Sequence, residues 1–409
     1  MSDQHISRRA VLAGAAVTAG AALLKKLPSA SAQEVVSSGI PVDSSSTPGA
    51  ATSAQSVRSA FEQPARTPVG VLTGASSTPL QHLTGTVMPN DLLFERHHSG
   101  IPTIDPAHYK LLVHGLVHRP MVFTLADLKR FPSTSRVYFI ECSGNGRGAY
   151  RDPKPEMTPQ LVDGLTSNGE WTGVSLATVL REAGVRSGAE WLLAEGSDAA
   201  KLSRSIPIEK AWDDAMIVYA FNGEPLRPSN GYPARLFLPG WEANTSIKWL
   251  RRIEVTDQPN MSKDETSKYT DPLPNGTARQ FSFVMDAKSI ITAPAHPTRL
   301  APGWHEVSGL AWSGRGRIVR VDVTTDGGRT WSQAELQSPV LPKAHTRFRL
   351  MWQWAGGAAT LMSRATDESG YTQPARDVFE AARGRGTDYH FNHIRSWRVE
   401  RDGQVVFGG

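Results

Sequence analysis

The chain of 409 residues has very little cysteine, and this scarcity excludes several classes of protein. Cys142 is the only cysteine, so the chain forms no internal disulfide. Zinc ribbons, Cys-x-x-Cys redox pairs and protein-bound iron–sulfur clusters each need several thiolates and are excluded for the same reason. A Cys-x-x-Cys-His attachment for haem is excluded as well. Any cysteine chemistry must therefore be that of Cys142 alone.

The net charge of the chain is also small. The chain has 44 Lys and Arg against 39 Asp and Glu, a net charge of +5. Residues 1–32 carry four basic residues and one acidic residue, so the remainder carries +5 less +3, or +2. No later run of like charge forms a basic stripe, and we therefore expect no nucleic-acid partner. With 20% charged and 39% apolar residues, the composition excludes global disorder.

Long apolar runs are missing except near the N-terminus, where residues 1–32 have the parts of a secretory signal. Arg8 and Arg9 precede an apolar stretch of about 15 residues, which is too short to span a bilayer comfortably. Ala30 and Ala32 fit a small-residue cleavage site. The adjacent arginines resemble the twin-arginine type of signal, which predicts export to the bacterial periplasm. An uncleaved anchor or a chance apolar helix is the alternative, and we expect no integral membrane protein.

The composition and the spacing of apolar residues change along the rest of the chain. Residues 33–78 are rich in Ser, Thr, Ala, Pro and Gly, which predicts a linker or an extended arm. Residues 79–272 mix strand-like runs, such as 137–140, with helix-like runs, such as 176–183. This mixture predicts an α+β domain.

Residues 273–409 have the pattern of an all-β domain. Apolar and polar residues alternate over 318–324, and a turn sequence of Asp and two Gly follows at 326–328. Further short strand-like runs occur at 348–352 and 360–364. The pattern predicts an immunoglobulin-like β-sandwich.

Cys142 lies directly after a predicted strand, in a glycine-rich loop that also contains Arg147. Glycine allows a backbone to approach a large ligand closely. A thiolate beside a guanidinium is favoured in its charged form and is a soft ligand for a metal. Chemistry alone leaves two alternatives open, a buried structural cysteine and the nucleophile of a Cys–His hydrolase.

The loop Cys142-Ser143-Gly144-Asn145 resembles the molybdenum-ligating Cys-x-Gly-Asn loop of the sulfite oxidase family of molybdopterin enzymes. Other segments resemble motifs of that family in the same order, at 94–98, 171–176, 205–207, 219–226, 231–235 and 247–250. Three stretches, at 265–270, 311–316 and 363–368, resemble the bacterial sulfane/sulfite dehydrogenase catalytic subunits of the Sox sulfur-oxidation system.

The resemblance covers about residues 80–405. It implies a molybdopterin-binding catalytic domain of the sulfite oxidase type over 79–272. It also implies that the immunoglobulin-like sandwich over 273–409 is a dimerisation domain.

The resemblance also implies roles for individual residues. Cys142 is implied as the protein's sulfur ligand to molybdenum. The residues implied to hold the pterin and its phosphate are Phe94, Arg96, His98, Asp198, Asn230, Arg235, Ser246, Ile247 and Lys248. Taken singly, Arg235 and Lys248 are also typical of solvated charges at strand edges, and Asp198 of a turn.

The substrate, a small oxyanion of sulfur, needs positive charge and hydrogen-bond donors. Arg96 and Arg147 match the arginines implied to supply the charge, and Tyr269 matches a tyrosine implied to donate near the reactive oxygen. Taken alone, Tyr269 is also typical of an exposed loop residue. His390 stands where animal members of the family carry a further arginine.

Two other positions depart from the family pattern. His97 stands in place of the usual Asn, and Asn230 stands where vertebrate members carry His.

The implied activity is that of a molybdenum-dependent sulfite dehydrogenase. It would oxidise sulfite, or sulfane sulfur bound to a carrier protein, by oxo transfer; a sulfane dehydrogenase that acts only on the carrier-bound sulfur of the Sox complex is the alternative. With no haem motif and no expected haem or flavin domain, a c-type cytochrome is the implied electron acceptor. The expected assembly is a homodimer or a heteromer with the cytochrome.

Three rival functions are disfavoured. An assimilatory nitrate reductase would carry electron-transfer domains in a longer chain, and the related methionine sulfoxide reductases lack a sandwich domain. A non-enzymatic immunoglobulin-like binding protein of the periplasm would contain no metal, whereas the resemblance implies that Cys142 binds molybdenum.

Overall fold

The computed structural model describes residues 51–273 and 275–409. The predicted export signal at 1–32 lies outside the described residues, as does the part of the predicted arm at 33–50. In the described part of the chain, no helix combines the length and apolarity needed to cross a membrane. Ser59–Gly409 forms one compact unit that contains both the α+β part and the all-β part.

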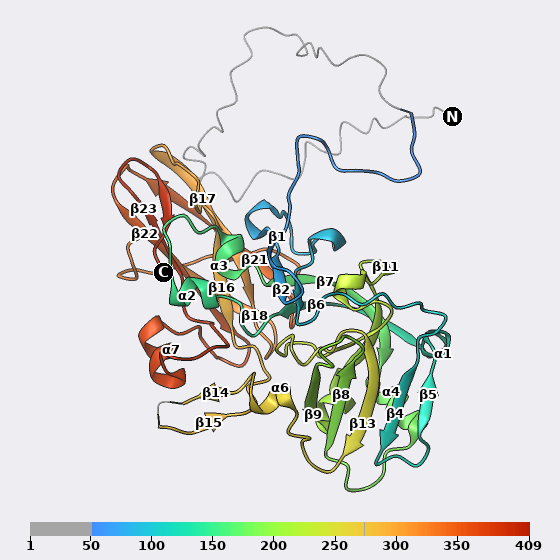
Figure 1. Cartoon of the computed structure of the whole chain (residues 1–409). Coiled ribbons are helices and arrows are strands. Elements are labelled where there is room, and N and C mark those ends of the chain that lie inside the picture. The colour runs from blue at the N-terminus through green and yellow to red at the C-terminus, as the bar shows by residue number, and fades with distance from the viewer. Residues whose placement is uncertain (1–50, 274) are drawn as a thin grey trace, which may run out of the picture. The chain divides into compact units, whose positions relative to one another are not determined.

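The α+β part contains two five-stranded sheets (Figure 1). The first has the order β11–β10–β7–β6, with β12 paired to β10, and the second has the order β5–β4–β13–β8–β9. The strands of the first are β6 (Ser133–Glu141), β7 (Thr166–Ser175), β10 (Met216–Phe221), β11 (Glu224–Pro225) and β12 (Arg235–Phe237). Those of the second are β4 (Leu111–Gly115), β5 (Met121–Phe123), β8 (Trp191–Gly196), β9 (Ser203–Pro207) and β13 (Leu250–Thr256).

Short helices connect and cover these sheets. They are α1 (Leu125–Arg130), α2 (Arg147–Arg151), α3 (Pro159–Asp163), α4 (Leu176–Ala183), α5 (Ile208–Asp213) and α6 (Lys263–Thr266). Single 3₁₀ turns occur at Leu80–His82, Asn90–Leu92 and Pro228–Asn230.

Helix α4 confirms the helix predicted at 176–183. Leu176, Val179 and Leu180 are fully buried in a core to which both sheets contribute. The helix ends at Gly184, which has φ +72° and donates its backbone N–H to the carbonyl of Leu180 at 2.9 Å. Glycine adopts this left-handed conformation without a steric penalty, so the sequence terminates the helix where it was expected to.

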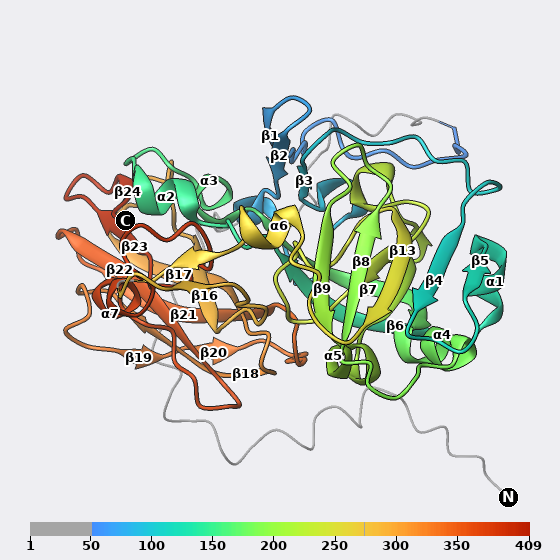
Figure 2. The same cartoon turned by 60° about the horizontal axis from the view of Figure 1, so that its bottom comes forward.

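The all-β part consists of two sheets, seen on the left of Figure 2. The four-stranded sheet has the order β16–β17–β21–β20, and the five-stranded sheet has the order β19–β18–β22–β23–β24. The strands of the first are β16 (Lys288–Ala293), β17 (Gly303–Trp312), β20 (Glu335–Leu336) and β21 (Thr346–Trp354). Those of the second are β18 (Ile318–Thr324), β19 (Ser332–Gln333), β22 (Ala359–Asp367), β23 (Ser396–Val399) and β24 (Val405–Phe407), and α7 (Arg376–Arg383) precedes β23.

These two architectures confirm the predicted fold class, an α+β domain followed by an all-β sandwich. The alternating segment 318–324 forms β18, and the runs at 348–352 and 360–364 lie within β21 and β22. A two-stranded ribbon, β14 (Asp271–Pro272) and β15 (Ala278–Arg279), stands where the boundary between the domains was predicted.

The described part of the predicted arm contains a hairpin. Its strands β1 (Thr67–Gly70) and β2 (Gly74–Ser77) pair with each other, and β2 also pairs with β3 (Glu95–His97). The arm therefore forms a three-stranded sheet with the strand that carries Arg96, one of the predicted cofactor residues.

The two domains share one hydrophobic core. Phe139 of β6 and Val162 of α3 pack in the same cluster as Trp312 and Phe348 of the sandwich. These four side chains are at most 1% exposed. Because burying such side chains is favourable by about 1.5–3 kcal/mol each, the shared core opposes separation of the domains.

A buried group of charges lies beside this core. Lys288 of β16 donates to Glu141 of β6 at 3.0 Å and lies 2.5 Å from Asp163 of α3. Asp163 also pairs with Arg395 at 3.2 Å. All four side chains are at most 2% exposed, so each charge depends on its partners instead of on water.

Replacing Lys288 with Met should leave two buried carboxylates without their shared cation. We expect the free energy of unfolding to fall by about 3–5 kcal/mol, measured by urea denaturation. The matched control is Arg299→Met, which breaks an ion pair with Asp402 whose side chains are 64% and 53% exposed. That exposed pair should contribute less than about 1 kcal/mol. Equal losses in the two variants would contradict the assignment.

Candidate active site

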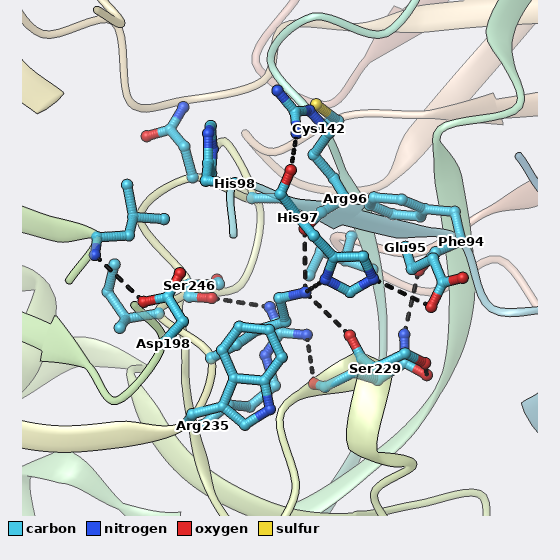
Figure 3. A pocket seen from close by; sticks show the side chains of 18 of the residues that line it. Phe94, Glu95, Arg96, His97, His98, Cys142, Asp198, Ser229, Arg235 and Ser246 are labelled. Atoms are coloured by element: carbon cyan, nitrogen blue, oxygen red, sulfur yellow. Dashed lines mark hydrogen bonds and ion pairs between the residues drawn. The ribbon is translucent and has the colours of Figure 1, made fainter. Parts of the chain in front are cut away.

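One pocket collects most of the residues predicted for the active site (Figure 3). Its wall comes from β3, the end of β6, the loop after β8, the segment between β12 and β13, and the loop after α6. The predicted residues that line it are Phe94, Arg96, His98, Cys142, Asp198, Asn230, Arg235, Ser246, Ile247, Lys248 and Tyr269. Of the predicted set, only Arg147 and His390 do not line this pocket.

The Cys142 loop is held by backbone and side-chain hydrogen bonds. Cys142 donates its N–H to the carbonyl of Leu165 and accepts from the N–H of Asn145, both at 2.9 Å. The Asn145 amide donates to Glu141 at 2.9 Å. Gly146 has φ +89°, and a Cβ there would lie 2.3 Å from Arg395, so no other residue fits this turn without displacing its neighbours. The loop therefore presents the thiol in a fixed position.

The electrostatics of Cys142 differ from those expected from the sequence. Desolvation raises the pKa of the thiol above its ordinary value, although Arg96 and Arg147 act in the opposite direction. The nearby guanidinium groups alone therefore do not make Cys142 a thiolate. A coordinated metal ion would do so, because metal ligation deprotonates a thiol outright.

Arg235 and Lys248 form a cationic wall of the pocket. Arg235 is only 4% exposed and donates to the carbonyls of Asn230 at 3.0 Å and Ser246 at 2.8 Å. Lys248 donates to the carbonyls of Arg96 at 3.0 Å and Ser229 at 2.9 Å. Neither cation forms an ion pair with a carboxylate of the described residues. They are not solvated strand-edge charges, which was the alternative interpretation of both.

Burial without a carboxylate partner has an electrostatic consequence. Desolvation and the neighbouring Arg235 lower the pKa of Lys248 well below its ordinary value, and desolvation lowers the pKa of Arg235. Both shifts mean that the surroundings disfavour the positive charges. A bound anion would reverse this penalty.

His97, the residue that departs from the family pattern, takes part in this wall. Its Nδ1 lies 3.0 Å from the Lys248 ammonium, which makes it an acceptor there. Its Nε2 lies 3.2 Å from Glu95. Desolvation lowers the pKa of His97, whereas the contact with His97 lowers the pKa of Glu95 to about 2. His97 thus orients Lys248 while remaining neutral.

The predicted tyrosine also lines the pocket. Tyr269 is hydrogen-bonded through its hydroxyl to His98 Nε2 at 2.8 Å. Desolvation and nearby cations, Arg96 first among them, lower the pKa of His98 to about 4, so this histidine is neutral at pH 7. Desolvation raises the pKa of Tyr269, which keeps its hydroxyl protonated as a donor. Tyr269 is therefore a pocket residue and not an exposed loop residue.

The remaining predicted pterin residues supply hydrogen-bonding groups to the pocket. Asn230 donates from its amide to the carbonyl of Phe94 at 3.1 Å, and the Ser246 hydroxyl accepts from the N–H of Leu238 at 3.0 Å. Asp198 is 3% exposed and lies in a turn, since its carbonyl accepts from the N–H of Lys201 at 3.0 Å. Asp198 is thus both a turn residue and a pocket residue.

Arg147 and His390 lie outside the pocket. Arg147 donates twice to the carbonyl of Asp388, at 2.9 and 2.6 Å, and its guanidinium lies 5.1 Å from the centre of the Tyr389 ring. His390 is fully buried, and its Nε2 lies 2.9 Å from Asp286. Neither residue lines this pocket, and the prediction that both lie beside the substrate stays a prediction.

Sequence reasoning missed several lining residues. They are Leu93, Glu95, His97, Ile140, Leu202, Ser229, Ala243, Asn244 and Trp249. Glu95, His97 and Trp249 lie within the motif segments at 94–98 and 247–250, and Leu93 and Ser229 are direct neighbours of a predicted residue; no such signal marks the other four. Arg204, which directly precedes the motif at 205–207, was not predicted either; its guanidinium lies 5.1 Å from the centre of the Tyr269 ring and donates to Asn244 at 2.6 Å.

The donor set of the pocket fits a molybdopterin cofactor. Arg235 and Lys248, which have no carboxylate partner, fit its phosphate, and Arg235 Nε is a buried donor without a hydrogen-bond partner. Asn230 and Asp198 present an amide and a carboxylate that suit the edge of a pterin, and Cys142 presents a soft sulfur ligand. These residues would hold the cofactor, while the metal would be bound mostly through the cofactor itself.

Replacing Arg235 with Gln should remove a buried cation from the phosphate site. We expect the purified variant to retain pterin roughly tenfold to a hundredfold more weakly, because a charge-assisted hydrogen bond contributes about 1.5–3 kcal/mol. The measurement is pterin fluorescence after oxidative release. The control is Arg252→Gln on β13, whose guanidinium pairs with Glu195 and does not line the pocket. Full pterin content in the Arg235 variant would contradict this role.

Comparison with known proteins agrees with this geometry. Residues 98–264 match the oxidoreductase molybdopterin binding domain, and residues 279–396 match the Mo-co oxidoreductase dimerisation domain. Sulfite oxidase of Gallus gallus is 32% identical over 311 residues, which cover 70% of this chain and 68% of that protein. A nitrate reductase [NADH] of Solanum lycopersicum is 33% identical over 349 residues, covering 74% of this chain but only 38% of the plant protein.

A solved structure extends the similarity to the whole fold. The sulfane dehydrogenase SoxCD from Paracoccus pantotrophus matches with a TM-score of 0.86 and 44% sequence identity, covering 89% of this chain and 96% of that chain. Both domains and the molybdopterin cofactor predicted from the motifs are thereby confirmed. The chain belongs to the sulfite oxidase family of molybdopterin-dependent, sulfur-oxidising oxidoreductases.

Proposed function

We propose that the protein is a periplasmic molybdenum-dependent sulfite dehydrogenase, which oxidises sulfite or carrier-bound sulfane sulfur and passes the electrons to a c-type cytochrome. The observation that carries the proposal is that Cys142, Arg96 and Tyr269 line one pocket together with the predicted pterin residues. This combination suits a small anionic sulfur compound at a metal held by one protein sulfur.

The chain's own residues bind and orient the reactants. When bound, the molybdenum cofactor supplies oxygen-atom transfer to a nucleophilic sulfur and accepts two electrons. Arg96 offers the positive charge that a sulfur oxyanion needs, and the protonated hydroxyl of Tyr269 offers a donor beside it. For that hydroxyl to donate to the substrate, neutral His98 donates from Nε2–H to the Tyr269 oxygen across the 2.8 Å hydrogen bond.

Features of the sequence support the proposed electron acceptor and location. A single cysteine leaves no site for covalently attached haem in this chain, so we expect the electrons to leave through a separate cytochrome. The predicted twin-arginine signal supports a periplasmic location, where c-type cytochromes are available. The dimerisation domain supports assembly as a homodimer or as a heteromer with the cytochrome.

A second candidate is a sulfane dehydrogenase that acts only on sulfur carried by a protein. The observation that favours it is the 44% identity to a sulfane dehydrogenase over 89% of the chain. Both substrates present a nucleophilic sulfur to the same pocket, so the two candidates share their site residues.

Replacing Cys142 with Ser should remove the only thiol available to the metal. We expect purified protein with strongly reduced molybdenum content and loss of at least about a hundredfold in sulfite-dependent reduction of cytochrome c, since a hydroxyl is a poor soft-metal ligand. Elemental analysis and steady-state kinetics measure the two effects. Stoichiometric molybdenum with the parent rate would show that Cys142 is not the ligand.

Steady-state reduction of cytochrome c with sulfite, with and without a sulfur-carrier protein bearing a sulfane, separates the two candidates. The sulfite dehydrogenase proposal expects turnover with sulfite alone. Turnover that occurs only with the loaded carrier would replace it with the second candidate. An unloaded carrier is the control, because it detects stimulation that does not involve sulfane sulfur.

A further inference from the structure

The sandwich domain places a histidine between two carboxylates behind the pocket wall. His390 Nε2 lies 2.9 Å from Asp286 Oδ2, and its Nδ1 lies 3.5 Å from Glu242 Oε1. The three residues are 0%, 8% and 3% exposed. A neutral imidazole would turn a lone pair toward one of the carboxylates, so the arrangement fits a doubly protonated, positively charged ring.

Other charges around His390 come from three further segments. Arg383 of α7 lies 3.6 Å from both Asp286 and Asp271 of β14, and Arg315 pairs with Asp286 at 2.6 Å. Desolvation and Arg383 lower the pKa of His390, but Asp286 and Glu242 outweigh them and raise it above the ordinary value. The charged form is therefore the favoured one in the folded protein.

Glu242 connects His390 to the pocket wall. Its pKa would rise on burial, but the contacts with His390 and Asn244 hold it below the ordinary value. Glu242 Oε2 accepts from the Asn244 amide at 2.9 Å, and Asn244 lines the pocket. The ionised Glu242 thus fixes which way the Asn244 side chain faces.

Asn244 in turn touches two parts of the active site. Its amide donates to the Ser143 hydroxyl at 3.0 Å, and Ser143 directly follows Cys142. Its Oδ1 accepts from Arg204 at 2.6 Å, and the Arg204 guanidinium lies 5.1 Å from the centre of the Tyr269 ring. The orientation of one amide therefore affects both the Cys142 loop and the support of Tyr269.

His390 also contacts the Cys142 loop through its backbone. Its N–H donates to the carbonyl of Ser143 at 2.7 Å, and its φ is +66°. A non-glycine residue in this left-handed region is uncommon and persists only where the surroundings hold it. The second domain therefore reaches the Cys142 loop at two points, the His390 backbone and the His390–Glu242–Asn244 side chains.

We propose that His390 is a positioning residue, whose positive charge keeps Glu242 ionised so that Asn244 holds Ser143 and Arg204 in the arrangement that the reaction needs. Without that charge, Glu242 would be a buried carboxylate with no cation at its Oε1, and it would take up a proton or turn away. Either change releases Asn244. The proposal concerns the molybdopterin enzyme itself and holds for sulfite and for carrier-bound sulfane alike.

The test uses the holoenzyme and the variants His390→Gln, Glu242→Gln and the corresponding double variant. Each single change should lower kcat about tenfold, as substitutions in the layer behind metal ligands commonly do, with molybdenum content unchanged. Because both residues act through Asn244, the double variant should be no slower than the slower single variant. Additive losses, or an unchanged kcat in His390→Gln, would overturn the proposal.

The pH profile separates positioning from a merely structural role. Since the pKa of His390 is raised on folding, its proton and its stabilising effect are present at low pH and are lost as the pH rises through that pKa. The kcat of the parent enzyme should therefore fall on the alkaline side, and His390→Gln should be slow at every pH. If the kcat of His390→Gln fell at high pH in the same way as the kcat of the parent enzyme, the role of His390 would be contradicted.

Two further variants test whether the effect is specific to the charge of His390 or follows from changing any buried histidine. His345→Gln changes another buried histidine of the sandwich, which bonds Thr166 at 2.9 Å and has its pKa lowered to about 3 by desolvation. It should lower the melting temperature without altering the alkaline limb of kcat. Asp286→Asn keeps His390 but removes its carboxylate on the side away from the pocket, so the alkaline limb should move to lower pH. If the alkaline fall of kcat in Asp286→Asn occurred at the same pH as in the parent enzyme, the proposal would be overturned even if His390→Gln failed to fold.

Discussion

The buried carboxylate of Glu141 is the group on which the active-site loop depends. It ends β6, directly before Cys142, and accepts hydrogen bonds from Lys288 at 3.0 Å, Trp312 at 2.6 Å and Asn145 at 2.9 Å. Two of these donors belong to the sandwich and one belongs to the loop itself. An isolated buried carboxylate costs several kcal/mol, so these donors have to be in place whenever the protein is folded. The loop that presents the thiol is thereby tied to the second domain.

A buried charge is costly unless a group of opposite charge lies beside it. This requirement is met in one way behind the pocket and in another way within it. Behind the pocket, the cations Lys288 and His390 each face two carboxylates of this chain. Within the pocket, Arg235 and Lys248 bond only to neutral acceptors, so their charge remains available for an anionic ligand. The contrast distinguishes charges that hold the scaffold from charges that bind the phosphate of a cofactor.

Local pattern predicted much of the fold and the pocket. Alternation predicted β18, helical spacing with a terminal glycine predicted α4, and the ordered motifs identified residues that meet in one pocket. The motifs gave no indication that Arg147 bonds the carbonyl of Asp388, nor that Arg204 and Asn244 lie beside the predicted residues. A motif indicates the type of a residue and its position in the chain, whereas the direction of a long side chain depends on partners that the motif does not contain.

The sequence by itself determined the family and the order of the two domains, and it left Cys142 as the one candidate thiol ligand, because motif spacing and a count of one cysteine are properties of the chain alone. Only the tertiary structure decided which charges are compensated. His390 and Asp286 are 104 residues apart in sequence, yet in the folded chain the His390 ring lies 2.9 Å from the Asp286 carboxylate. The free energy of a buried charge depends on the groups within a few ångströms of it, and folding alone brings those groups together.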